Sequence, residues 1–189
     1  MDDQLLALNE IMQRDDEIAA LNQTVYQLTR ENTSMRKTID TVLRVKCKRG
    51  EGAFALNKEL KTCVESNLLI AIQQGFASLG ARMKVPDLAV NVLLHTLVGV
   101  TGNDIPCAVL HSPQYTIVYK ENGLWIVCTL GEFTDILYRY VQPLVMKYSS
   151  EYIETHDVTD THISLFNTLL NEQHFASSVK TMVKLYKDY

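Results

Sequence analysis

The first 49 residues contain no glycine or proline, and their apolar residues recur with the seven-residue period of a coiled coil. Read as heptads, the a positions are Gln4, Ile11, Ile18, Val25, Asn32 and Ile39, and the d positions are Ala7, Arg14, Leu21, Leu28, Met35 and Val42. A lone helix of this length cannot bury such a stripe, so the pattern predicts a partner. We therefore expect residues 1–49 to form a long helix of an intermolecular coiled coil.

The composition of this apolar seam favours two parallel strands. β-branched residues at a with leucine at d favour dimers, and an asparagine at one a position can pair with its twin and fix the register. The predicted oligomerisation residues are Ile11, Ile18, Leu21, Val25, Leu28, Asn32, Met35, Ile39 and Val42. The chain's first expected partner is therefore a second copy of itself in a parallel dimer. A trimer comes next, and a helix packed on the chain's own domain is the remaining alternative.

Charged residues beside the seam agree with a parallel pair only in its second half. Glu31 at g can attract Arg36 at the next e position of a partner, whereas Glu10 and Asp15 occupy equivalent sites and repel. Arg14 at a d position weakens the same end. We expect the helix pairing of the coil to be most stable from Ile18 to Val42.

A short basic cluster follows the heptads and ends at two glycines, Gly50 and Gly52, which mark a domain boundary. The cluster consists of Arg44, Lys46, Lys48 and Arg49. It could contact phosphates, which makes a nucleic-acid-associated module the alternative function. No aromatic residues interleave with the cations, and the formal net charge of the chain is −4. A solvated helix end whose cations complement the helix dipole is therefore the favoured interpretation.

Residues 50–189 read as a compact, mainly α domain with a small antiparallel β-hairpin or meander, an α+β class. Apolar periodicity predicts helices over residues 54–80, 86–99 and 132–154, with Pro143 kinking or splitting the third. Thr159 or Asp160 should cap a helix over residues 161–175, and Ser177 or Ser178 should begin a last helix.

The pair Asn122-Gly123 predicts a two-residue type I′ hairpin between strands in residues 114–130, after a first strand at residues 107–112. This turn places Tyr119 opposite Ile126 and puts both on the face that should join the core. The opposite face is more mixed, and we expect it to be partly covered, at Trp125. The turn also predicts that Glu121 lies opposite Leu124.

No motif in the sequence indicates catalysis. Phosphate-binding glycine loops and the GxSxG elbow are absent, and none of the four cysteines is singled out as a nucleophile. We expect no enzyme activity, no cofactor and no metal. Cys107, His111, His95 and Cys128 could be combined as zinc ligands, but they lack the tight spacing of zinc knuckles.

The cysteines and the N-terminus predict a location. Four cysteines without a CxxC pair suit free thiols in a reducing, intracellular compartment. The acidic start MDDQLLALNE is not a signal peptide, and no apolar run is long enough to span a membrane. We expect no membrane association.

The order of parts resembles a known group of proteins. A helix ends at Leu93-Leu94-His95, an irregular turn follows at residues 102–106, and the hairpin YTIVYKENGLWIV precedes the helix FTDILYRYVQPLV. Over about residues 90–150, and in the leading coil, this resembles uncharacterised coiled-coil proteins of nucleocytoplasmic large DNA viruses. The zinc-binding segment typical of those proteins is missing here. The resemblance implies a viral structural or virion-associated protein, in a virion or a viral factory, and it carries over no catalytic residues. From the coil and the domain together, we expect a structural or interaction protein whose coil sets the valency and whose domain binds another protein. An enzyme dimerised by its coil is the third hypothesis.

Overall fold

The structure is a computed structural model that describes residues 2–48, 58–77, 83–99, 102, 104–111 and 114–186. In the first helix, side chains are described for residues 13–39 only, and the side chains of Leu110 and His111 are left out. The chain divides into two compact units, Met1–Glu51 and Gly52–Tyr189. Each unit is described by itself.

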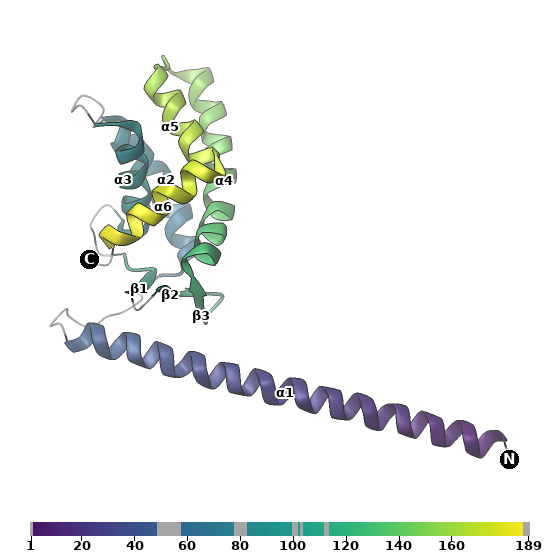
Figure 1. Ribbon diagram of the computed structural model, residues 1–189. Helices are drawn as coiled ribbons and strands as arrows, with labels where there is room; N and C mark the ends of the chain where they lie inside the picture. Colours follow the sequence, from purple (N-terminus) through teal and green to yellow (C-terminus); the bar gives the residue numbers. More distant parts are fainter. Residues whose placement is uncertain are drawn as a thin grey trace. The chain divides into compact units, whose positions relative to one another are not determined.

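The first unit contains one long helix, α1 (Asp2–Lys48). Most residues of α1 are neither β-branched nor helix breakers. Several threonine hydroxyls donate hydrogen bonds to backbone carbonyls one turn earlier. Thr29 donates to the carbonyl of Val25 at 2.7 Å, and Thr33 donates to the carbonyl of Thr29 at 2.8 Å. The predicted long N-terminal helix is confirmed (Figure 1).

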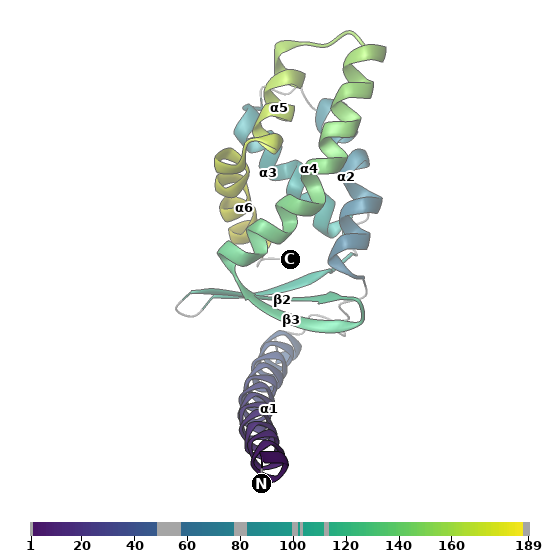
Figure 2. The same ribbon diagram turned by 90° about the vertical axis from the view of Figure 1, so that its right-hand side faces the viewer.

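The second unit combines five described helices with one three-stranded antiparallel sheet in the order β1-β2-β3. Its elements are α2 (Leu60–Ala77), α3 (Val85–Val98), β1 (Cys107–His111), β2 (Tyr115–Glu121), β3 (Leu124–Thr129), α4 (Leu130–Thr155), α5 (Asp160–Leu170) and α6 (Glu172–Tyr186). Figures 1 and 2 show these helices gathered on one side of the sheet. The predicted mainly α fold with a small antiparallel sheet is confirmed.

The core forms mainly between helices, where their apolar stripes meet. α2 contributes Leu60, Val64, Leu68 and Ile72 at four-residue steps, and α4 contributes Phe133, Leu137, Val141 and Val145 in the same way. Buried residues of α3, α5 and α6 belong to the same cluster. The buried sheet residues Ile117 and Tyr119 extend it, with the Tyr119 ring edge-on to Phe133 at a centroid distance of 6.2 Å.

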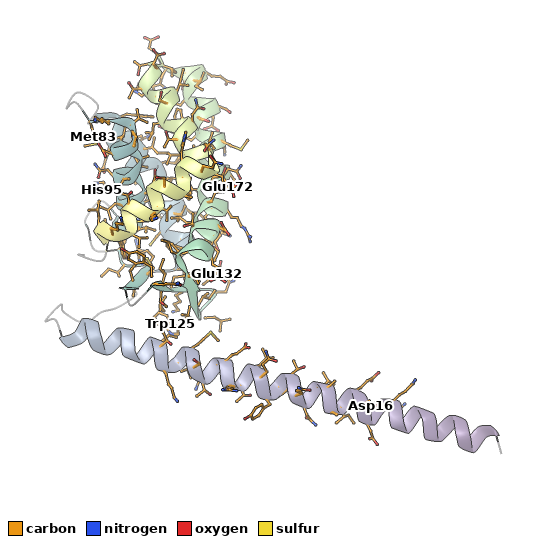
Figure 3. All side chains as sticks on the ribbon, in the orientation of Figure 1. Asp16, Met83, His95, Trp125, Glu132 and Glu172 are labelled. Atoms are coloured by element: carbon orange, nitrogen blue, oxygen red, sulfur yellow. The ribbon has the colours of Figure 1, made fainter. Side chains whose placement is uncertain are left out.

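The hairpin has the predicted turn and register. Asn122 and Gly123 both have positive φ, at 50° and 76°, and Glu121 lies opposite Leu124. Trp125 is 40% exposed, so the cover predicted for it is only partial. Trp125 lies on the side of the sheet away from the helices that supply the core (Figure 3).

Of the two alternatives predicted for Pro143, a kink or a split, the split is excluded, and one predicted helix start is wrong. α4 runs through Pro143 without a break, and its axis bends between its two halves (Figure 2). The last helix begins at Glu172 rather than after Ser177. Asn171 separates it from α5, because its side-chain oxygen accepts a hydrogen bond from the N–H of His174 at 3.0 Å and so caps the new helix.

Gly75 allows α2 to approach α3 closely. A Cβ atom at this position would lie 3.1 Å from both Leu88 Cδ1 and Val92 Cγ2, which is tighter than ordinary contact. We expect Gly75→Ala to change the free energy of unfolding by less than about 1 kcal/mol, because gained helix propensity offsets the crowding. Gly75→Val should destabilise by about 2–3 kcal/mol, because a branched side chain forces the helices apart. Urea unfolding of both variants checks this, and equal losses would contradict it.

Candidate functional site

The strongest candidate site is the apolar stripe on α1, which lies open in the single chain. Its described apolar residues are between 38% and 65% exposed: Ile18, Leu21, Val25, Leu28 and Met35. Asn32 is exposed in the same stripe, and Ile39 is half-buried. The side chains of the remaining predicted seam residues, Ile11 and Val42, lie outside the described residues. A row of exposed apolar side chains at heptad spacing is the signature of an interface.

The charged pair predicted to flank the seam is also exposed. Glu31 and Arg36 both face solvent, and within the chain Glu31 accepts one hydrogen bond from Gln27 Nε2 at 3.1 Å. Both side chains are therefore placed to meet a partner helix. The basic residues Arg44, Lys46, Lys48 and Arg49 lie outside the described side chains, so the nucleic-acid alternative stays a prediction.

A polar cluster fixes the point where the chain enters the second unit. Lys58 Nζ donates to Asp104 Oδ2 at 2.8 Å, and Asn67 Nδ2 donates to the same oxygen at 3.0 Å. Asn67, which is buried on α2, also donates to the carbonyl of Thr96 near the end of α3. The cluster therefore joins the start of α2, the end of α3 and the segment before β1.

This cluster sets the ionisation of Asp104. Partial burial acts to raise the pKa of Asp104, but hydrogen bonds from Lys58 and Asn67 and the charge of Lys58 outweigh it and hold the pKa below its ordinary value. Gly99 gives the carboxylate room, because a Cβ there would lie 2.7 Å from Asp104 Oδ2. Sequence reasoning missed the cluster, because its members are far apart in the chain and form no motif.

The depressed pKa makes the cluster a source of pH-dependent stability. A group with a lowered pKa in the folded state stabilises the fold above its unfolded pKa, and this is lost as pH falls through the folded value. We expect Asp104→Asn to cost about 1–3 kcal/mol at pH 7. The difference from the wild type should shrink below about pH 4. Thermal melts between pH 7 and pH 3 measure it, and a constant difference would exclude this account.

Burial suppresses the reactivity of two of the described cysteines. Cys63, Cys107 and Cys128 are buried and none of them is in a disulfide, as predicted, and the side chain of Cys47 is outside the described residues. Burial, with a smaller contribution from nearby Asp104, raises the pKa of Cys63 to about 12. Burial, followed by the charge of Glu132, likewise raises the pKa of Cys128 to about 12. Both thiols therefore stay protonated near neutral pH and are poor nucleophiles.

Among the described residues, further candidate sites include a hollow between α2 and α3 and the scattered histidines. A hollow of about 390 Å³ lies between α2 and α3, and its lining includes Gly75, Asn91 and His95. Asn91 Nδ2 is already bonded to the sulfur of Met83 at 3.2 Å, and the lining contains no carboxylate or thiol. No three described His, Cys, Asp or Glu side chains group as metal ligands, and His111 of the proposed zinc set is outside those side chains.

Within the described part of the chain, no helix combines the length and apolar character needed to cross a bilayer. Comparisons with models of protein families, with curated proteins and with solved structures found no match. The candidate site is therefore interpreted from the chain's own residues. Of the features described above, the α1 stripe is the one with both a sequence period and an exposed surface.

Proposed function

We propose that this chain is a non-enzymatic interaction protein that dimerises through α1 as a parallel coiled coil and presents its globular domain to a protein partner. The observation that carries the proposal is the open stripe of α1, in which Leu21, Val25 and Leu28 are each more than half exposed. Pairing two helices removes these apolar side chains from water. This stabilises the dimer by about 25 cal/mol for each Å² of apolar surface buried. The chain's resemblance to viral proteins suggests a setting for this role, a structural component of a virion.

The side chains of the seam support two strands in parallel. Val25 is β-branched at an a position, and Leu21 and Leu28 occupy the neighbouring d positions, which is the dimer-favouring arrangement. In a parallel pair the two Asn32 amides meet at the axis and can donate to each other. An antiparallel pair would place Asn32 against an apolar residue and leave the amide unpaired.

The globular domain offers apolar side chains for a further partner. Met146 and Ile153 on α4 are both about half exposed and lie two helical turns apart, on one side of the helix. Such a pair can anchor a partner that covers this side of α4. Two domains held by one coil would engage a repetitive partner with two sites at once, which raises the overall affinity.

Charges placed in the seam should abolish the dimer. Val25→Glu with Leu28→Glu would bury four carboxylates in the paired helices, so we expect the dimer dissociation constant to rise at least about 100-fold. Sedimentation equilibrium of the full chain measures this. Tyr26→Glu is the matched control, because Tyr26 is 72% exposed and lies off the seam. The proposal fails if the wild type is a monomer, or if the double variant dimerises as well as the wild type.

Asn32 should set the number of strands at a cost in stability. We expect Asn32→Ile to raise the melting temperature of the full chain's coil, because packed hydrocarbon replaces a buried polar pair. The same variant should sediment as a mixture of dimers and trimers, since isoleucine at a no longer penalises trimers. A variant that melts lower, or that remains a pure dimer, would show that Asn32 does not have this role.

A further inference from the structure

The two edges of the sheet differ in how they are protected. At the β1 edge, the Tyr186 hydroxyl of α6 donates to the carbonyl of Cys107 at 3.0 Å. At the β3 edge, the strand reads LWIVCT and contains no charge and no proline. Natural edge strands usually carry charges, proline or a bulge that discourage pairing with another strand. β3 lacks the charges and the proline.

The turn determines which backbone groups of β3 point outward. In a two-residue hairpin, the residues that flank the turn, Glu121 and Leu124, exchange backbone hydrogen bonds, and such pairs alternate along the ladder. The N–H and C=O groups of Trp125 and Val127 therefore point away from β2. Farther along the strand, the N–H of Thr129 donates to Glu132 Oε2 at 2.8 Å.

Exposed apolar side chains lie on the same strand. Trp125 is 40% exposed and Leu124 is 70% exposed, whereas the neighbouring sheet residues that face the core are buried. Figure 3 shows Trp125 at the sheet end of the domain, on the side away from the helices. An added strand would cover apolar surface and satisfy backbone groups in one step.

We propose that β3 pairs antiparallel with β3 of a second copy and so forms one continuous six-stranded sheet. The register that uses all four outward groups places Trp125 opposite the second copy's Val127, with Ile126 facing its own counterpart on the two-fold axis. Each Trp125–Val127 pair exchanges two backbone hydrogen bonds. The pairing also sets an aromatic ring beside a β-branched side chain, which is a favourable cross-strand combination.

The second copy is favoured as the added strand because of where the hairpin lies. Glu59, immediately before α2, accepts a hydrogen bond from the N–H of Gly123 at 2.8 Å, so the turn is tied to the point where the chain enters the domain. Ten residues, 49–58, lie between Lys48 at the end of α1 and Glu59. Fully extended, they span at most about 36 Å, at roughly 3.6 Å per residue. In a parallel dimer, each hairpin is therefore joined through a short tether to one of two neighbouring helix ends.

This inference rests on the proposed coiled-coil dimer. A tether of this length gives the second β3 an effective concentration of about millimolar, so a short strand pair that is weak by itself can form. An antiparallel β3–β3 contact is also isologous, as two-fold symmetry requires. The coil and the sheet would then be two parts of one symmetric interface.

Amide hydrogen exchange of the full chain tests the pairing. We expect the amides of Trp125 and Val127 to exchange at least about tenfold more slowly in the wild-type dimer than in the Val25→Glu, Leu28→Glu monomer. The amide of Ile126 is the internal control, because it bonds to Tyr119 within the hairpin and should be protected in both proteins. Sedimentation of the same samples gives the oligomeric state.

The outcomes separate the two proposals. If the wild type is a dimer but Trp125 and Val127 exchange equally fast in both proteins, the strand pairing is excluded and the coil stands. If these amides are equally slow in both, the edge is covered within one chain, and the pairing is again excluded. A monomeric wild type overturns both proposals.

A backbone variant tests the same pairing without altering the coil. Val127→Pro removes an N–H that points away from β2, a position at which an edge strand tolerates proline. We expect the full chain to remain a dimer while the Trp125 amide loses at least about tenfold of its protection. Val127→Thr keeps the N–H and the β-branched shape, and it should behave as the wild type. Unchanged protection of Trp125 in Val127→Pro would overturn the pairing.

Discussion

An apolar stripe on a long helix is the physical constraint on which the organisation of this chain depends. α1 extends over 47 residues, and its apolar seam residues from Ile18 to Met35 are exposed in the single chain. Helices gain most of their stability in proteins from packing an apolar face rather than from intrinsic propensity. The proposed dimer follows from this constraint, because pairing two copies buries both stripes and satisfies Asn32 at the same time.

The globular unit follows a different principle, in which helices pack on one another and the end of that bundle covers one face of a small sheet (Figure 2). Three strands are too few to bury themselves, so Ile117 and Tyr119 depend on the helices that pack over them. Polar contacts then fix the ends of these elements. Asp104 accepts hydrogen bonds from Lys58 and Asn67, and Glu59 accepts one from the N–H of Gly123 in the hairpin turn. The segment before α2 is therefore bonded both to the loop before β1 and to the turn.

The described side chains place thiols inside and several large apolar groups at the surface. The buried thiols of Cys63 and Cys128 have raised pKa values, and the described lining of the hollow beside Gly75 has no carboxylate or thiol. Exposed large apolar side chains include those on α1 and α4, and the edge strand β3 carries no charge. These are features of surfaces that bind protein chains, and the β3 edge adds backbone hydrogen bonding to side-chain packing.

The sequence by itself determined the features that depend on local period and turn chemistry. The heptads without glycine or proline specified a long first helix, and Asn122-Gly123 specified the turn and register of the hairpin, because only such residues adopt positive φ easily. The tertiary structure decided which faces are covered. Trp125 is open because the helices cover the other face, and Asp104 meets Lys58 and Asn67 because the fold brings three distant segments together. Asn171 resembles many surface asparagines in the sequence, and only its hydrogen bond to the N–H of His174 marks it as a helix cap. Burial and long-range polar contacts depend on neighbours in space, which a linear pattern does not contain.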